Sequence, residues 1–152
     1  MREVTCQRSA GLRSATLTCL IDRNGKRGNQ GRPGSAPVVD LPEPEQQHGA
    51  QVVEITSSAQ CAEPARHADA VFTSQHGIAL AVQSADCLPV LFATPASVAA
   101  AHAGWRGLAS GILENTVQAL AARGCPTEAI CAWLGPAIGA TAFEVGSDVV
   151  QA

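Results

Sequence analysis

The sequence has little aromatic character and little charge. Only 3% of its 152 residues are aromatic, none is tyrosine, and 15% are charged. Hydrophobic residues make up 46%, which excludes the apolar-poor composition of a disordered chain. The core must therefore be built mainly from alanine, valine, leucine and isoleucine, and the length suits one domain.

The chain also lacks a long apolar run and an excess of positive charge. No apolar run approaches the roughly 20 residues that cross a bilayer, and the net charge of −3 argues against nucleic-acid binding. Residues 1–32 depart from this pattern, because seven basic residues against Glu3 and Asp22 give them a net charge of +5. Such a start can be a targeting segment or a nucleic-acid arm, but no sustained amphipathic or apolar stretch accompanies it. We therefore expect a cytoplasmic protein with no membrane or nucleic-acid partner.

No two cysteines form a CxxC pair, which excludes a zinc ribbon and a thioredoxin-like motif. The six cysteines are Cys6, Cys19, Cys61, Cys87, Cys125 and Cys131. The sequence shows no signal peptide, so the reducing cytosol is the expected compartment. Most of these thiols are predicted to be free, small, buried side chains, with Cys87 as the exception.

The chain divides near residue 45. Residues 1–44 are predicted to form an irregular segment, because residues 22–37 are rich in glycine and proline. Residues 45–152 are predicted to form one α/β domain with a mixed sheet. Its strands are expected at 52–55, 70–73, 78–84, 88–93, 98–101 and 130–134. One amphipathic helix is expected at 108–123, weakened by Gly111 and capped by Gly124.

Two residues that can carry chemistry stand next to strand ends. Cys87 precedes the strand expected at 88–93, and His102 follows the strand expected at 98–101. If these strands are neighbours, both side chains converge on one edge of the sheet. A thiolate and an imidazole there can be a nucleophile pair or two ligands of a borderline-soft metal. The alternative is that both are ordinary core residues.

His48 offers a third ligand. It lies in a loop before the first expected strand, beside Gly49. With Cys87 and His102 it would complete a Cys-His-His set. Three protein ligands leave a fourth position open, which distinguishes a catalytic zinc site from a closed structural one.

An anion site is predicted beside these residues. Gly104 and Gly107 flank Trp105 and Arg106 where the helix begins, so backbone N–H groups can lie open beside a guanidinium that suits phosphate. The alternative is that the glycines only form a tight turn and Trp105 covers the core. His67 and His76 are expected to be solvated surface residues. The Gly/Pro-rich turn at 134–139 is expected to line the same cleft.

Several blocks of the sequence resemble the signature of the YfiH/laccase-domain family of purine nucleoside phosphorylases. They occur in the family's order, with similar spacing, across residues 45–152. The blocks are EQQHG (45–49), ADAVFT (68–73), AVQSADCLPVLF (81–92), AAAHAGWRGL (99–108), AWLGPAIG (132–139) and FEVGSDV (143–149). The resemblance implies a layered α/β sandwich with mixed sheets.

The resemblance also implies a metal held by His48, Cys87 and His102, which would be the catalytic residues. Zinc is expected, with copper as the alternative. The family is associated with phosphorolysis of adenosine, inosine and methylthioadenosine, and with adenosine deamination. In that chemistry Arg106, with Gly104 and Trp105, is expected to hold the phosphate or the purine nucleoside.

The sequence departs from the family at both ends. Residues 16–28 do not reproduce the family's TTRxGGVS block, and Ala152 precedes a later SYRR-type block. We therefore expect a truncated member whose sandwich is incomplete at the C-terminus. The rival functions are a copper-dependent polyphenol oxidase, an inactive metal-binding fragment, and a hydrolase that uses Cys87 and His102 without metal. A multicopper oxidase would need more than the four histidines present.

Overall fold

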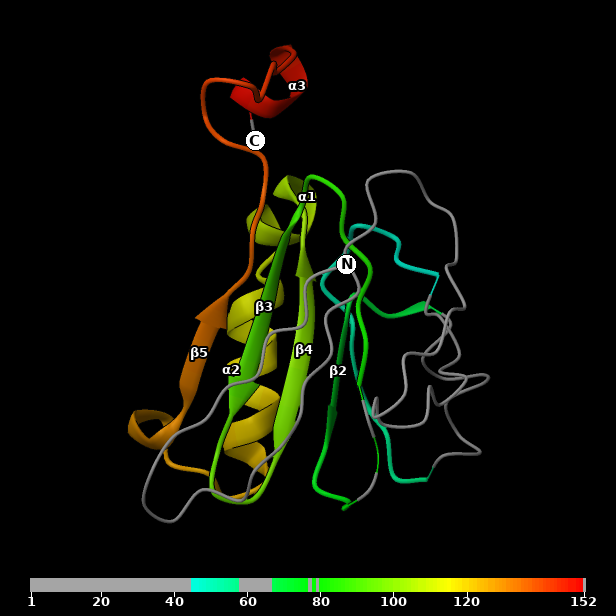
Figure 1. Ribbon diagram of the computed structural model, residues 1–152, viewed down its shortest axis with the longest axis vertical. Coiled ribbons are helices and arrows are strands. Elements are labelled where there is room, and N and C mark those ends of the chain that lie inside the picture. Colours follow the sequence, from blue (N-terminus) through cyan, green and yellow to red (C-terminus); the bar gives the residue numbers. More distant parts are fainter. Residues whose placement is uncertain (1–44, 58–66, 77, 79, 152) are drawn as a thin grey trace, which may run out of the picture.

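The fold is α/β with a mixed sheet, as the sequence predicted, and the sheet has five strands (Figure 1). The structure is a computed structural model. The residues that it describes are 45–57, 67–76, 78 and 80–151. The predicted irregular segment 1–44 lies outside the described residues, as do Cys6, Cys19 and Cys61.

The sheet has the strand order β1-β2-β4-β3-β5. The strands are β1 (Val52–Glu54), β2 (Ala70–Thr73), β3 (Leu88–Ala93), β4 (Val98–Ala103) and β5 (Cys131–Leu134). β1 and β2 are parallel, and every other neighbouring pair is antiparallel. β3 and β4 form a hairpin, so the residues before β3 and at the end of β4 lie together.

The predicted helix at 108–123 is wrong in its bounds, because two helices occupy this region. They are α1 (Trp105–Ala109) and α2 (Ile112–Ala122). Gly111 adopts φ 85° and ψ 33°, a left-handed conformation that interrupts the helix and precedes Ile112. The predicted end is confirmed, since Gly124 has φ +83° and donates its N–H to the Ala121 carbonyl. The short helices η3 (Thr127–Ala129) and α3 (Ser147–Val150) complete the described part of the chain.

The strand predicted at 78–84 is also wrong. Its described residues form no strand, although Leu80 and Val82 are buried as the alternating pattern requires. Gln83 forms an isolated β-bridge rather than part of a strand, and its own N–H and carbonyl bond to a side chain. The Gln46 amide donates to the Gln83 carbonyl at 2.7 Å and accepts from the Gln83 N–H at 2.7 Å. The described residues of this segment therefore lie outside the five strands of the sheet, and the Gln46 side chain holds them at Gln83.

One face of the sheet carries an apolar row that crosses all five strands. Its members are Val53, Val71, Ala100, Leu91 and Trp133, each in register with the next. The buried residues of the loop before β3 pack against this row. Burial of such apolar surface contributes roughly 25 cal/mol per Å², which stabilises the packing of Leu80 and Val82 against the sheet.

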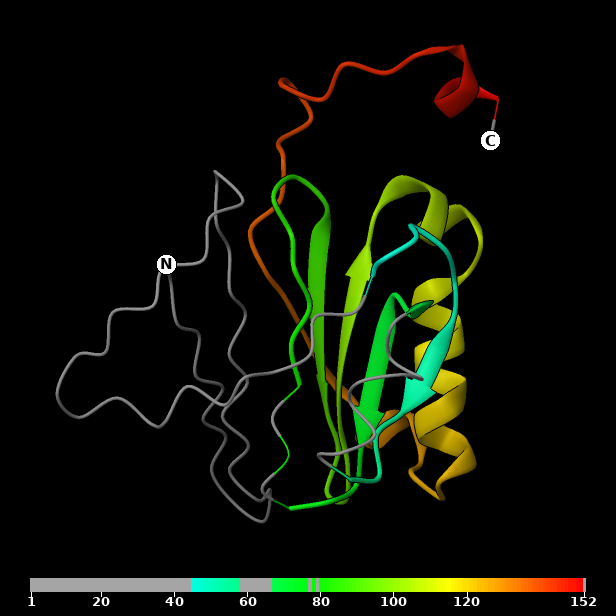
Figure 2. The same cartoon turned by 90° about the vertical axis from the view of Figure 1, so that its right-hand side faces the viewer.

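The other face is covered by α2 (Figure 2). Ile112, Thr116 and Leu120 recur at helical spacing and are fully buried. The facing strand, β4, presents the small side chains of Ala99 and Ala101, which are also fully buried. The Thr116 hydroxyl donates to the Ile112 carbonyl at 2.7 Å, so its burial leaves no unpaired polar atom.

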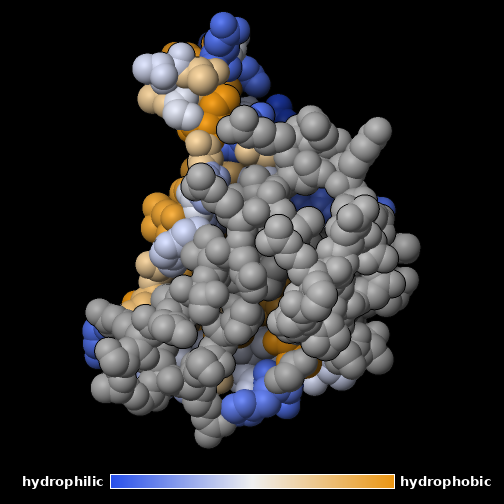
Figure 3. All heavy atoms as spheres, in the orientation of Figure 1, coloured by the Kyte–Doolittle hydropathy of each residue, from blue (hydrophilic) through white to orange (hydrophobic). Residues whose placement is uncertain are grey.

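Apolar side chains remain exposed along β5 and on the segment that follows it. Leu134 is 60% exposed, and Val145 and Val150 are 46% and 76% exposed. Hydrophobic surface is accordingly visible along the β5 side and on the C-terminal segment in Figure 3. Among the described residues, no helix combines the length and the apolar character that a membrane span requires.

Candidate metal centre

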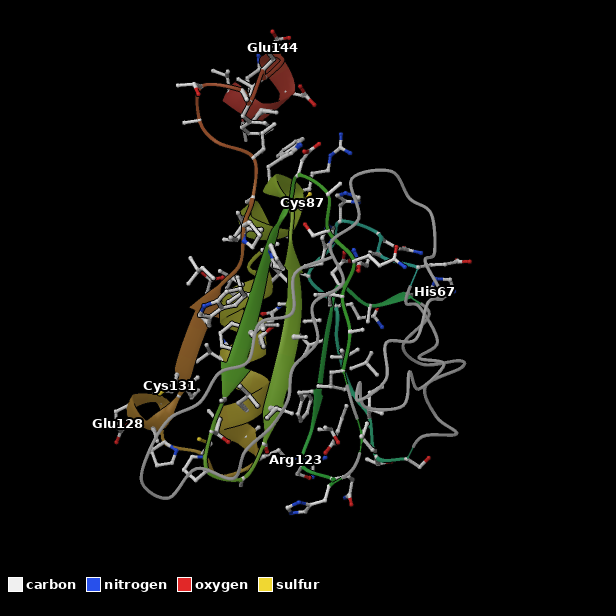
Figure 4. The ribbon with its side chains drawn as sticks, viewed as in Figure 1. His67, Cys87, Arg123, Glu128, Cys131 and Glu144 are labelled. Atoms are coloured by element: carbon white, nitrogen blue, oxygen red, sulfur yellow. The ribbon has the colours of Figure 1, made fainter. Side chains whose placement is uncertain are left out.

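Three strand beginnings and one strand end meet at the same end of the sheet. β1 and β2 run parallel, and β4 runs antiparallel to both β2 and β3. β1, β2 and β3 therefore begin where β4 ends. His48 precedes β1, Cys87 precedes β3, and His102 lies in β4, where it pairs with Pro89. Figure 4 shows Cys87 at the upper end of the sheet, whereas Cys131 and Arg123 lie toward the opposite end.

The structure brings His48, Cys87 and His102 together. Their ligand atoms all lie within 4.8 Å of one another. The two imidazole rings meet edge to face, with centroids 4.8 Å apart and an interplanar angle of 84°. Zinc bonds of about 2.0–2.3 Å would hold tetrahedral ligand atoms roughly 3.5 Å apart, so small side-chain rotations suffice to bind one ion. His48 is exposed and His102 is buried, which leaves the site open on one side.

Asp69 is a site residue that the sequence analysis did not single out. Its carboxylate is 1% exposed and contacts both histidine-bearing segments. Oδ1 accepts from the His48 N–H at 2.9 Å and lies 3.0 Å from His102 Nδ1. Oδ2 accepts from the Gln47 N–H at 3.2 Å and the Gly49 N–H at 2.8 Å. One feature of the sequence could have identified Asp69, namely that it is an acidic residue at the start of an apolar strand. Charged residues are rarely buried without partners, so an acidic residue at such a position is expected to have specific ones.

The backbone of His48 is left-handed, with φ 58°. For a residue with a side chain this conformation costs roughly 1–2 kcal/mol. The successive N–H groups of Gln47, His48 and Gly49 converge on the Asp69 carboxylate. Such a concave arrangement of amides binds anions, and these hydrogen bonds offset the unfavourable backbone conformation.

Gly104 leaves the space that the ligands occupy. A Cβ atom at this position would lie 3.0 Å from Cys87 Sγ and 3.0 Å from His48 Cδ2. Gly107 is equally close to the loop, since its Cβ would lie 2.8 Å from the Gly49 carbonyl oxygen. The two predicted glycines therefore allow the β4–α1 turn to pack directly against the ligand side chains and their loop.

Trp105 and Arg106 begin the short helix α1 next to this turn. The Arg106 guanidinium stacks over the Trp105 ring, 4.8 Å from its centroid. It also lies 3.8 Å from an Asp148 carboxylate oxygen, and both side chains are more than 60% exposed. A surface pair of this kind is weak, so Arg106 can exchange Asp148 for another anion.

The surroundings of Cys87 favour its protonated form in the metal-free chain. Burial is the largest cause that raises the pKa of this thiol, followed by the negative charges of Asp86 and Asp69. The Ser84 hydroxyl donates to the Cys87 carbonyl and shapes the turn before β3. A bound cation reverses this balance, because coordination deprotonates a thiol.

The remaining predicted residues lie outside the ligand group. His67 and His76 are exposed, and Gln47 Nε2 lies 2.9 Å from His67 Nδ1. The turn at 134–139 runs beside the site: Gly135 donates its N–H to the Pro89 carbonyl at 2.8 Å, and Ile138 donates to the Asp86 carbonyl at 2.9 Å. This segment therefore borders the loop that carries Cys87.

Proteins of the same family share much of this sequence. The family model described as multi-copper polyphenol oxidoreductase laccase matches residues 29–152. Purine nucleoside phosphorylase YfiH of Escherichia coli (strain K12) is 50% identical over 110 residues, 71% of this chain and 43% of that protein. Purine nucleoside phosphorylase PA4543 of Pseudomonas aeruginosa is 49% identical over 112 residues, 71% of this chain and 42% of that protein.

Solved structures match the fold. Neisseria meningitidis protein NMB0706 is 46% identical with a TM-score of 0.60, covering 73% of this chain and 45% of that one. YlmD from Geobacillus stearothermophilus is 31% identical with a TM-score of 0.63, covering 72% and 44%. The chain thus spans less than half the length of the relatives it matches. Together, the family match and these identities show that the chain belongs to the family described as multi-copper polyphenol oxidoreductase laccase.

Proposed function

We propose that residues 45–152 form the metal-binding domain of a purine nucleoside phosphorylase. The observation that carries this proposal is the group of His48, Cys87 and His102 within 4.8 Å of one another. It occurs in a chain about half of whose aligned residues are identical to those of proteins named purine nucleoside phosphorylases. The proposed reaction is phosphorolysis of adenosine, inosine or methylthioadenosine, with these three residues at its centre.

Zinc fits the donor set. One thiolate and two imidazoles match known zinc ligands, and three protein ligands leave one position for a reacting molecule. Copper accepts the same donors, so it remains the alternative ion. A divalent ion held there supplies positive charge to an oxygen of the reacting molecule. Cys87 serves as a ligand in this proposal, since its raised pKa is opposite to that of an activated nucleophile.

Arg106 is the proposed phosphate-binding residue. Its guanidinium is exposed, stacks over the Trp105 ring, and lies 3.8 Å from an Asp148 carboxylate oxygen. Inorganic phosphate can therefore displace this carboxylate and form a bidentate pair. A phosphate oxygen then attacks C1′ of the ribose while the bond to the purine nitrogen breaks. The purine leaves with the bonding electron pair and takes up the proton that the attacking phosphate hydroxyl gives up.

Adenosine deamination is a proposed second reaction of the same site. It needs a water molecule that attacks C6 of the purine and an ammonia molecule that leaves. A three-ligand zinc centre with an open position is suited to hydrolysis of this kind. The exposed side of the ligand group, at His48, is where the purine would enter.

Two other functions remain in competition. The family description favours a copper-dependent polyphenol oxidase, but only His48 and His102 of the four histidines in the sequence lie in the ligand group. Dioxygen uptake with phenols in proportion to bound copper would support that function. The second competitor is a metal-binding chain without activity of its own, since it spans 43% of the first relative.

The test is metal content of the purified chain, followed by adenosine turnover with and without phosphate on the same samples. His48→Ala removes a ligand, and His76→Ala changes an exposed histidine outside the group. We expect about one metal ion per chain, lost only in His48→Ala, with phosphate-dependent release of adenine. Metal without turnover would identify a binding domain that is inactive alone. Wild-type protein without metal would contradict the proposal.

A further inference from the structure

The buried carboxylate of Asp69 has a distinctive set of partners. It is 1% exposed, and within the described residues its ion-pair partner is the His102 imidazole, with no lysine or arginine in contact. A buried carboxylate is stable only when its oxygens are well hydrogen-bonded. Here four N–H groups do this, and all belong to the segments that carry His48 and His102.

The contact with His102 selects one form of the imidazole. An ionised carboxylate only accepts hydrogen bonds, so His102 Nδ1 must carry the proton that points at Asp69 Oδ1, 3.0 Å away. The lone pair of Nε2 is then free for a metal. The His102 backbone N–H also donates to the Asp69 carbonyl at 2.7 Å, which fixes the ring relative to β2.

The contact with the loop fixes the other histidine. Three successive N–H groups, from Gln47 to Gly49, point at the same carboxylate. They hold His48 at φ 58°, and this conformation directs the chain so that the His48 ring meets the His102 ring at 4.8 Å. Without the carboxylate, the amides would lose their acceptor and His48 would relax to an ordinary backbone conformation.

We propose that Asp69 is the positioning residue of the metal centre, which couples His48 to His102 through one carboxylate. The inference rests on the metal site of the proposed function. Asp69 touches neither the ion nor the substrate: it presents Nε2 of His102 and sets the backbone of His48. Oδ1 serves both histidine segments, whereas Oδ2 serves only the loop.

Asp69→Asn tests the coupling with minimal change of shape. Whichever way the amide is turned, its NH₂ group replaces an oxygen that accepts two N–H donors in the native chain. We expect the Kd for zinc, measured by competition with a chromogenic chelator, to rise roughly 10–100-fold, as is typical when an outer partner of a metal ligand is lost. Cobalt substituted for zinc should show an altered d–d absorption spectrum.

Asp86→Asn is the matched control. Asp86 is exposed beside Cys87, and its charge acts on the same thiol. If Asp69 acts through hydrogen bonds, Asp86→Asn leaves the zinc Kd within about threefold of the wild-type value. An equal loss in both variants would show that negative charge alone matters and would overturn the proposal. Wild-type affinity in a folded Asp69→Asn chain would also overturn it.

A measurement on the metal-free wild-type chain covers the case in which Asp69→Asn does not fold. Two-bond ¹H–¹⁵N correlation spectra at pH 8.5 report the tautomer of each histidine ring, with His102 assigned from a His102→Gln sample. We expect the Nδ1–H tautomer for His102, and slow hydrogen exchange of the His48 and Gly49 amides. An Nε2–H tautomer would overturn the proposal. Because this result needs no metal, it is distinguishable from failure of the proposed function.

Discussion

At the scale of the residue, the side chains of the ligand group pack so closely that one added carbon atom would disturb them. Cys87 and His48 both approach Gly104 so closely that a Cβ atom there would lie 3.0 Å from each side chain. The backbone of Gly104, with φ −73° and ψ 166°, is one that any residue adopts. The requirement for glycine is therefore steric, and it arises from the side chains of Cys87 and His48, two of the proposed metal ligands.

Gly104→Ala should weaken metal binding without straining the backbone. The added methyl group pushes Cys87 Sγ and His48 apart by a few tenths of an ångström, and metal sites tolerate only about 0.5 Å of displacement. We expect the zinc Kd to rise about tenfold or more, measured by chelator competition. Gly139→Ala is the control, because a Cβ there would have no neighbour within 4 Å. Equal Kd values for the two variants would contradict the steric argument.

The protonation of Cys87 gives a second prediction for a single residue. Burial, and then Asp86 and Asp69, raise the pKa of its thiol in the metal-free chain. The folded chain thus binds this proton more tightly than the unfolded chain does. Its contribution to stability is present below the unfolded pKa of about 8.5 and is lost as the pH rises above that value.

Alkylation by iodoacetamide, followed at each cysteine by mass spectrometry, measures this shift. We expect the rate at Cys87 in metal-free protein to reach half its maximum above pH 8.5. In Asp86→Asn the midpoint should move to lower pH, because one of the causes of the shift is removed. A midpoint well below pH 8.5 would instead identify an activated thiolate and favour a metal-free cysteine hydrolase.

At the scale of the element, Gly111 determines where one helix ends and the next begins. The apolar spacing continues through Leu108, Ile112 and Thr116, so periodicity alone predicts one helix. Gly111 nevertheless adopts φ 85° and separates α1 from α2. As a result Leu108 is 43% exposed, whereas Ile112 is fully buried. The break turns α1 toward the metal centre while α2 lies on the sheet.

Gly111→Ala should destabilise the chain by about 1–2 kcal/mol, because a side chain disfavours the left-handed conformation by that amount. Space is available, since the nearest atom to an added Cβ is Glu114 Oε2 at 3.7 Å. The loss would be measured by urea unfolding followed by circular dichroism. Ser110→Ala is the matched control, since Ser110 has a right-handed backbone with φ −91°. A smaller effect for Gly111→Ala than for Ser110→Ala would refute the argument.

The strands were predictable where local sequence decides them. The runs at 70–73 and 88–93 match β2 and β3 residue for residue, because apolar runs of this length fit strands covered on both faces. The run at 78–84 has the same alternation but lies outside the ladder. At Gln83 it forms only an isolated bridge, and the N–H and carbonyl of this residue bond to the Gln46 side chain; pairing between residues so distant in sequence leaves no periodic signal.

The candidate site was likewise predictable only where local sequence indicates it. Residue types and strand ends offered His48, Cys87 and His102 as one possible set, the family resemblance selected it, and the fold brings the three together. Asp69 was not proposed, because its importance depends on four N–H groups that meet only after β1, β2 and β4 are assembled. A buried acidic residue at a strand start is a weak signal from sequence and a strong one once its partners are known.

At the scale of the whole molecule, the described part of the chain has the proposed metal ligands at one end of the sheet, and exposed apolar side chains along β5 and the segment after it. The proposed ligands come from the loop before β1, the turn before β3 and the end of β4. An ion bound there therefore ties together segments that are distant along the chain. Leu134 and Val150, which are 60% and 76% exposed, lie in segments that such an ion would not join.

Metal binding should consequently stabilise the entire fold. An ion that binds the folded chain alone stabilises it by RT ln(1 + [L]/Kd), about 2.7 kcal/mol when free zinc is 100 times the Kd. For a chain of this size that corresponds to a Tm higher by roughly 5–10 °C. The increase should depend on zinc concentration, disappear with a chelator and be absent in His48→Ala. Differential scanning calorimetry at several zinc concentrations measures it. A Tm that does not change with zinc, in a chain that binds one ion, would mean that the unfolded chain binds zinc as tightly as the folded chain does. That result would contradict a metal centre that is preassembled at the end of the folded sheet.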